Sequence, residues 1–155
     1  MLKERGQTVA VADGATGGLI SAGLIAVPGA TSFYSGGGVI YSLKGRSILL
    51  DVTDEELAGM RSVTERYALL QARGIRDRFG ADWGVAETGS AGPGKHPFGI
   101  KSGMSCIAVV GPGAAIASTV ETNSDDRIEN MKAFALAALS LLTDALEELG
   151  QTGGR

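Results

Sequence analysis

Short runs of β-branched residues alternate with longer apolar segments along the first half of the chain. Residues 8–12 (TVAVA) predict a buried strand that stops at the turn Asp13-Gly14. The apolar stretch 19–27 follows and predicts a helix that is closed by Pro28-Gly29. Residues 33–41 predict a second strand, in which three consecutive glycines indicate a bulge or the close approach of another element or a ligand.

The second half of the chain is richer in helical patterns and contains one clear hairpin. Its predicted elements are a helical turn (42–50), a helix (64–79) with Tyr67, Leu70, Ile75 and Phe79 as core contacts, a third strand (83–88), a hairpin formed by 104–110 and 114–120 around Gly111-Pro112-Gly113, and a long final helix (127–149).

This order of elements predicts an α/β fold. Strands that alternate with helices, followed by a hairpin and a closing helix, indicate a mixed, mostly parallel sheet of about five strands with helices on both faces. The length of 155 residues suits one domain, predicted to span residues 1–150. Residues 151–155 are predicted to be a disordered tail.

Composition narrows the classes of partner. Hydrophobic residues make up 44% of the chain and aromatic residues only 5%, so the core is predicted to be aliphatic. The net charge is −3 and no Lys/Arg cluster occurs, which argues against binding to nucleic acid or to an anionic membrane. The start of the chain lacks the apolar region of a signal peptide and no stretch is long enough to span a bilayer, so a cytoplasmic location is predicted.

One cysteine and one histidine limit the metal and redox chemistry. Cys106 lies in an apolar run and is interpreted as a buried, inert thiol. His96 lies in a loop, where a solvated histidine is the ordinary interpretation, although it could titrate near neutral pH. We therefore expect no metal and no cofactor.

Two glycine-rich segments follow predicted strands. Residues 13–18 (DGATGG) come after the first strand and residues 88–94 (TGSAGPG) after the third. In sheets of this kind ligands gather at the carboxyl ends of parallel strands, beside helix N-termini that favour anions. Neither segment is a Walker loop or a dinucleotide fingerprint, and glycine also serves plain turns. The pattern alone therefore indicates an anion or a polar small molecule.

Several motifs together resemble the CinA C-terminal domain family, the family of bacterial nicotinamide mononucleotide deamidases and competence/damage-inducible proteins. The resemblance covers about residues 8 to 149 and implies a three-layer α/β/α fold. The motifs that carry it are, in order, residues 12–18 (ADGATGG), 27–29 (VPG), Gly36-Gly37, Tyr41-Ser42, 63–65 (VTE), 79–82 (FGAD), Thr88-Gly89, 91–94 (AGPG) and 107–109 (IAV).

The resemblance implies an amidohydrolase that removes ammonia from the carboxamide of nicotinamide mononucleotide. In this family a serine of the first motif (AESxTGG) looks like the nucleophile, and a lysine of the second (YSNxxK) like its activating base. This chain carries Gly14 in place of the serine, Arg46 in place of the lysine, Asp13 in place of the glutamate and Leu43 in place of the asparagine. Arginine stays protonated and cannot act as a base, so the covalent route is closed unless another hydroxyl takes over.

Other residues of the motifs offer alternatives. Asp13 could activate a water in the space left by Gly14, or it could simply cap the following helix. Arg46 could clamp a carboxylate or phosphate, or it could be a surface residue. Arg127 matches an arginine of a family GDR motif, or it could be a solvated residue of the first helical turn. Tyr41 matches a family tyrosine that could equally be a core residue. Rescue of the base by Lys44 is not expected, because its position faces another direction on a helix.

Two functions remain open at this stage. One is an amide hydrolase with altered catalytic residues, acting on nicotinamide mononucleotide or another small amide. The other is a catalytically silent homologue that binds a small molecule or nucleotide, and either is expected to form homo-oligomers. The predicted catalytic residues are Asp13, Thr16, Tyr41 and Arg46, and the predicted ligand-binding residues are Gly14, Ala15, Gly17, Gly18, Gly37, Ser42, Thr88, Gly89, Ser90 and Arg127.

Overall fold

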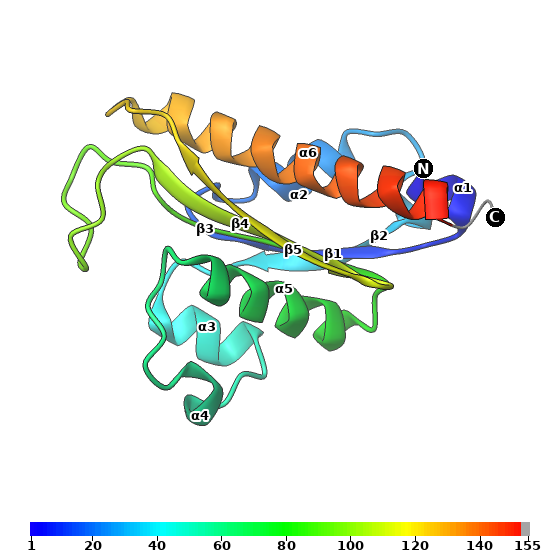
Figure 1. Ribbon diagram of the computed structural model, residues 1–155, viewed down its shortest axis with the longest axis horizontal. Helices are drawn as coiled ribbons and strands as arrows, with labels where there is room; N and C mark the ends of the chain where they lie inside the picture. Colours follow the sequence, from blue (N-terminus) through cyan, green and yellow to red (C-terminus); the bar gives the residue numbers. More distant parts are fainter. Residues whose placement is uncertain (153–155) are drawn as a thin grey trace.

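A computed structural model describes residues 1–152 of the protein. It contains a five-stranded sheet with helices on both faces (Figure 1). The elements are α1 (Leu2–Arg5), β1 (Val9–Asp13), α2 (Leu19–Ile25), the 3-10 helix η1 (Ala30–Ser32), β2 (Tyr34–Val39), α3 (Leu43–Leu49), α4 (Asp54–Leu57), α5 (Glu65–Phe79), β3 (Trp83–Ser90), β4 (Met104–Gly111), β5 (Ala114–Glu121) and α6 (Arg127–Thr152).

The sheet has the strand order β2-β1-β3-β4-β5. The pairs β1–β2 and β1–β3 are parallel, whereas β3–β4 and β4–β5 are antiparallel. Helices α2 and α6 cover one face, and α3, α4 and α5 lie on the other (Figure 1). The predicted three-layer architecture with a mixed five-stranded sheet is confirmed, with parallel and antiparallel pairings in equal number.

Alternate residues of the central strands build two separate cores. Val9, Val11 and Val85 belong to the core that α2 and α6 cover. Ala10, Ala12 and Ala86 belong to the core beneath α5. The smaller side chains on that face let α5 approach closely, and a Cβ atom at Gly84 would lie 2.0 Å from the carbonyl oxygen of Ala72. The strand pattern therefore sets both faces and the spacing of the layers.

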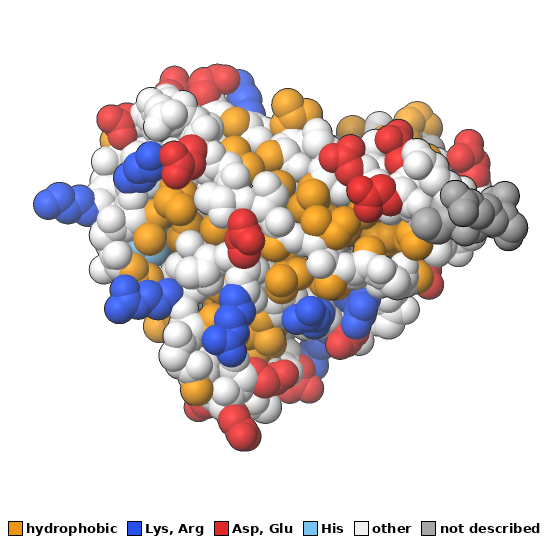
Figure 2. All heavy atoms as spheres, viewed as in Figure 1, with side chains coloured by type: hydrophobic (Ala, Val, Ile, Leu, Met, Phe, Trp, Pro, Cys, Tyr) orange, Lys and Arg blue, Asp and Glu red, His pale blue; other side chains and the backbone are white. Residues whose placement is uncertain are grey.

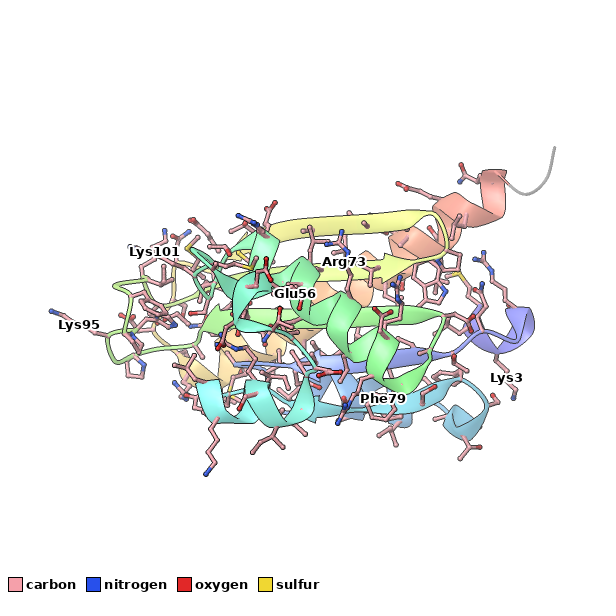
Figure 3. All side chains as sticks on the ribbon, turned by 90° about the horizontal axis from the view of Figure 1, so that it is seen from below. Lys3, Glu56, Arg73, Phe79, Lys95 and Lys101 are labelled. Carbon is pink, nitrogen blue, oxygen red and sulfur yellow. The ribbon has the colours of Figure 1, made fainter. Side chains whose placement is uncertain are left out.

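The glycine run of β2 shows both a bulge and a close approach, the alternatives that the sequence left open. The pairing of β1 with β2 skips Ser35, next to Gly36, whose φ is 144°. A Cβ atom at Gly37 would lie 2.2 Å from the backbone oxygen of Val11, and one at Gly36 would lie 2.4 Å from the ring of Phe79. The expectation that Phe79 is a core contact was wrong, since 43% of this residue is exposed. Its ring instead lies over the edge strand β2 at the end of α5 (Figure 3), where Gly36 leaves room for it.

Two predicted boundaries change in the structure. Gly89 and Ser90, which were expected to open a loop, continue β3, because they pair with Ser105 and Met104 of β4. Helix α6 includes Gln151 and Thr152, which were expected to be part of a disordered tail. Residues 153–155 of that predicted tail lie outside the described part of the chain.

The parallel strands place the two glycine-rich segments at one edge. Strands β1, β2 and β3 all end there, and helices α3, α5 and α6 begin there. The end of β1 at Asp13 and the end of β3 at Ser90 therefore lie at the same edge of the sheet. This edge, on the left in Figure 1, holds the candidate site.

Candidate functional site

A cavity of about 450 Å³ opens at the carboxyl edge of the parallel strands. Several segments that end or begin at this edge contribute to its wall. The lining residues are Gly14 and Ala15 after β1, Ile40 to Leu43 after β2, Ser62 and Tyr67 at the start of α5, Thr88 to Gly92 at the end of β3, Gly94 to Phe98 in the following loop, and Arg127 at the start of α6. Its volume suits a small molecule.

The charged groups of the cavity wall are cationic. Among the described residues that line the cavity, Lys95 and Arg127 carry charge, and His96 is the titratable imidazole; none is acidic. Lys95 lies at the tip of its loop and points away from the protein (Figure 3). Lys and Arg side chains project from this end of the molecule, on the left in Figure 2. Such a wall favours an anionic ligand.

Arg127 is the best-placed cation of the wall. Its Nη1 donates a hydrogen bond to the carbonyl oxygen of Gly92 at 2.5 Å, and its Nη2 donates one to the hydroxyl of Tyr41 at 3.0 Å. These contacts tie the loop after β3 and the segment after β2 to the start of α6. A guanidinium has five N–H donors, so the side chain can still bind a phosphate or carboxylate.

Hydroxyl groups line the same wall but are partly engaged. The Oγ1 of Thr88 accepts a hydrogen bond from the backbone N–H of Val63 at 3.0 Å, and the Oγ of Ser42 accepts one from Gly45 at 3.0 Å as the cap of α3. Val63 has a φ of 56°, which is rare for a β-branched residue. Thr88 therefore helps to hold a strained backbone beside the cavity while its own hydroxyl proton can still be donated.

Asp13 lies outside the cavity wall and is saturated with donors. Its buried carboxylate accepts hydrogen bonds from the Oγ1 of Thr16 at 2.7 Å, the N–H of Ile20 at 3.0 Å, and both the N–H and the Oγ of Ser21 at 3.3 and 2.7 Å. These groups lie at the start of α2, so the geometry favours the capping role that the sequence allowed. The hydroxyl of Thr16 is committed to the same contact.

The predicted site residues thus divide into two groups. Arg46 stacks beside the cavity, with its guanidinium 5.8 Å from the ring of Tyr67 and its Nη1 3.4 Å from that hydroxyl. The residues that line the cavity are Gly14, Ala15, Tyr41, Ser42, Thr88, Gly89, Ser90 and Arg127, and those outside its lining are Asp13, Thr16, Gly17, Gly18, Gly37 and Arg46.

Sequence reasoning missed Glu87, which is fully buried behind the cavity wall. Its Oε2 accepts hydrogen bonds from the backbone N–H of Gly14 at 3.1 Å and of Thr16 at 2.9 Å. Its Oε1 accepts one from the Oγ of Ser105 at 2.7 Å. The available signal was an acidic residue inside the apolar run WGVAET. A carboxylate in a buried strand needs hydrogen-bond donors around it, so its presence indicates such donors.

The pKa of Glu87 is raised above its usual value of 4.5, because the effect of burial outweighs the hydrogen bonds from Ser105, Thr16 and Gly14. The folded protein then keeps a proton at pH values where the unfolded chain has lost it. The free energy of unfolding is therefore expected to fall as the pH rises from 4.5 through the folded-state pKa of Glu87.

Urea denaturation of the wild type and of Glu87→Gln over a pH series checks this expectation. The pH dependence of every other group is common to both proteins, including that of the Cys106 thiol, whose pKa is raised by burial. As the pH rises, the unfolding free energy of the wild type should fall relative to that of Glu87→Gln. A difference that stays constant, or moves in favour of the wild type, would contradict the raised pKa.

Asn130 is a second buried polar residue that sequence reasoning missed. Its Nδ2 donates to the carbonyl oxygens of Ala91 at 3.0 Å and Ser124 at 2.8 Å, and its Oδ1 accepts from the Oγ1 of Thr122 at 2.5 Å. Ala91 lines the cavity, so Asn130 fixes this part of the wall to α6. No sequence motif marked it, because its partners are backbone atoms that only the fold brings together.

His96 and Cys106 occupy different environments. His96 lines the cavity, and its Nδ1 accepts a hydrogen bond from the backbone N–H of Phe98 at 3.2 Å. Partial burial lowers the pKa of this imidazole. Cys106 is a buried free thiol, as predicted, 3.6 Å from the Oγ1 of Thr119. Within residues 1–152, no group of three or more metal-ligating side chains comes together, and no helix is long and apolar enough to cross a membrane.

Comparisons with known proteins show which proteins this chain resembles. A family model described as the CinA C-terminal domain matches residues 1–146. A CinA-like protein of a Synechococcus species is 42% identical over 111 residues, which are 72% of this chain and 26% of that protein. A CinA-like protein of Chloroherpeton thalassium is 35% identical over 150 residues, 94% of this chain and 36% of that protein. The chain thus spans about a third or less of these relatives.

Solved structures share the fold over nearly their whole length. The competence damage-inducible protein A (ComA) of Klebsiella pneumoniae is similar with a TM-score of 0.86 and 28% identity, over 94% of this chain and 90% of that one. A competence-damaged protein (CinA) superfamily protein of Enterobacter cloacae is similar with a TM-score of 0.81 and 31% identity, over 92% and 85%.

Proposed function

Because this chain belongs to the CinA C-terminal domain family, we propose that its cavity binds a small anionic ligand of the nucleotide type, with nicotinamide mononucleotide as the first candidate. The observation that carries the proposal is the cationic wall centred on Arg127. The guanidinium of Arg127 is already oriented by Gly92 and Tyr41, so that binding a phosphate costs little further ordering of this side chain.

We infer that the covalent route implied by the family resemblance does not operate at this site. Residue 14 has no side chain to act as a nucleophile, and Arg46 stays protonated. The carboxylates of Asp13 and Glu87 are buried and occupied by donors. We therefore propose a binding role without a serine–lysine pair.

Hydrolysis of a small amide by a water molecule is the second candidate function. The observation that favours it is His96, an imidazole that lines the same cavity as the hydroxyls of Thr88 and Ser90 on β3. In its neutral form, with Nδ1 accepting from Phe98, its Nε2 carries the proton and could donate to a developing negative charge. The water would attack the amide carbon, and the amine would leave as ammonia.

Calorimetric titration of the purified protein with nicotinamide mononucleotide tests the binding role. We expect saturable binding that weakens at high salt, together with at least about tenfold weaker binding of nicotinamide riboside, which lacks the phosphate. Inorganic phosphate should compete. Equal affinity for the nucleotide and the riboside would contradict an anion site. If neither molecule binds, this ligand class is rejected.

Ammonia release measured in the same samples separates the two candidates. Binding without ammonia supports the silent role. Ammonia release that disappears in His96→Ala, while nucleotide affinity is kept, supports hydrolysis by water.

A further inference from the structure

The buried carboxylate of Glu87 has no part in the ligand contacts proposed above. It nevertheless accepts hydrogen bonds from the loop after β1, whose residues Gly14 and Ala15 line the cavity and are called its floor below. Its Oε2 receives the N–H groups of Gly14 and Thr16, the residues on either side of the cavity-lining Ala15. Its Oε1 is fixed from the other side by the hydroxyl of Ser105 on β4. One side chain thus connects β3 and β4 with the loop after β1.

Glu87 lies behind two glycines of the cavity wall, with its backbone carbonyl closest to Gly14 and its carboxylate closest to Gly89. A Cβ atom at Gly14 would lie 2.3 Å from the carbonyl oxygen of Glu87 and 3.2 Å from its Oε2. A Cβ atom at Gly89 would lie 2.5 Å from its Oε1 and 2.7 Å from the Oγ of Ser105. Neither glycine has a positive φ, so close approach rather than backbone conformation demands glycine at both positions.

We propose that Glu87 is a positioning residue of the ligand site. It packs against Gly14 and Gly89 and occupies the space that side chains at these two positions would need. The carboxylate holds the floor loop against β3 at a distance that admits only glycine. On this account Gly14 is not an isolated loss of a nucleophile, because the loop is built around a carboxylate instead. The proposal rests on the proposed function only in that the cavity is the ligand site.

This arrangement has a consequence for the ligand. At Gly14 and Gly89 the cavity wall is backbone without a side chain. A bound molecule can therefore lie closer to the wall there, and it finds no side-chain hydroxyl at these positions. If the loop were released from Glu87, two buried N–H donors would lose their partner. An unpaired buried donor is costly, so the loop would move to reach water or another acceptor. The shape of the cavity floor would then change.

The test compares Glu87→Gln with Glu87→Leu. A glutamine keeps an oxygen for the N–H groups of Gly14 and Thr16, and its amide can donate to the hydroxyl of Ser105. A leucine has similar volume but accepts nothing. Glu121→Leu is the matched control, because Glu121 lies on β5, largely exposed and paired with Lys101.

Hydrogen exchange of the Gly14 and Thr16 amides is the first readout, since it needs no ligand. We expect at least about tenfold faster exchange in Glu87→Leu, near wild-type exchange in Glu87→Gln and Glu121→Leu, and unchanged protection of the β1 amides in all three. Unchanged protection of Gly14 and Thr16 in Glu87→Leu would overturn the proposal. If Glu87→Leu does not fold, Glu87→Gln decides alone, and faster exchange of these two amides in it overturns the proposal.

Affinity for nicotinamide mononucleotide is the second readout. We expect it to weaken at least about tenfold in Glu87→Leu and to be restored to within about threefold in Glu87→Gln. A folded Glu87→Leu that binds like the wild type would overturn the positioning role. If the wild type itself fails to bind the nucleotide, the proposed ligand is wrong, and the exchange readout still judges the role of Glu87.

Discussion

Replacing Gly14 by serine is expected to lower the free energy of unfolding by about 3 kcal/mol, the upper part of the range for inserting atoms into a filled space. The serine Cβ would meet the backbone oxygen of Glu87 at 2.3 Å, and a backbone atom cannot move aside as a flexible side chain can. The same clash means that the double variant Gly14→Ser/Arg46→Lys is not expected to release ammonia from nicotinamide mononucleotide.

Gly94→Ser is the matched control for this experiment. Gly94 also lines the cavity, but a Cβ atom there would meet nothing within 4 Å, and its φ is not positive. Denaturant unfolding should place this variant within about 0.5 kcal/mol of the wild type. If Gly14→Ser proves as stable as Gly94→Ser, the loop is not held at the distance described. Ammonia release by the double variant would then indicate that the covalent site can be rebuilt.

Replacing Arg127 by alanine is expected to weaken the binding of nicotinamide mononucleotide at least about tenfold, which corresponds to about 1.4 kcal/mol. The guanidinium is the fixed cation of the cavity wall, and its loss also frees Tyr41 and the carbonyl oxygen of Gly92. Arg127→Lys should recover only part of the affinity, because an ammonium keeps the charge but not the paired donors.

Arg78→Ala provides the control for charge. Arg78 lies near the end of α5, whereas the cavity lies at the end of the sheet where α5 begins. Its removal changes the net charge equally, so it should leave the affinity within about twofold, a difference of about 0.4 kcal/mol. Equal losses in both variants would mean that general electrostatic attraction, rather than a site at Arg127, accounts for binding. An unchanged affinity in Arg127→Ala would remove the basis of the proposed anion site.

Local signals predicted most of the elements. Residues 64–79 begin at a threonine cap and end at a glycine, and the structure has α5 at Glu65–Phe79 with Thr64 and Gly80 as its caps. The Gly-Pro-Gly turn predicted the hairpin of β4 and β5. Where tertiary pairing extends an element, the prediction stopped short, as at Gly89 and Ser90 of β3.

The location of the cavity was also predictable, since it follows from strand order. Both glycine-rich segments follow strands that run in parallel, so their ends meet at one edge. Chemistry at that edge was less predictable. Asp13 had two interpretations from sequence, and only the positions of Ile20 and Ser21 in space show which donors surround it. The roles of individual residues depend on such neighbours.

By itself, the sequence determined the α/β layers, the family resemblance and the presence of Gly14 and Arg46 in its motifs, because these depend on periodicity, turn residues and residue identity. The tertiary structure alone decided that Glu87 bonds to Gly14 and Thr16 across more than seventy residues of chain, and that Arg127 meets Tyr41. Such contacts join backbone and side-chain groups from distant segments. No local sequence pattern specifies them. In the unfolded chain these groups bond to water, and only the fold brings their protein partners within reach.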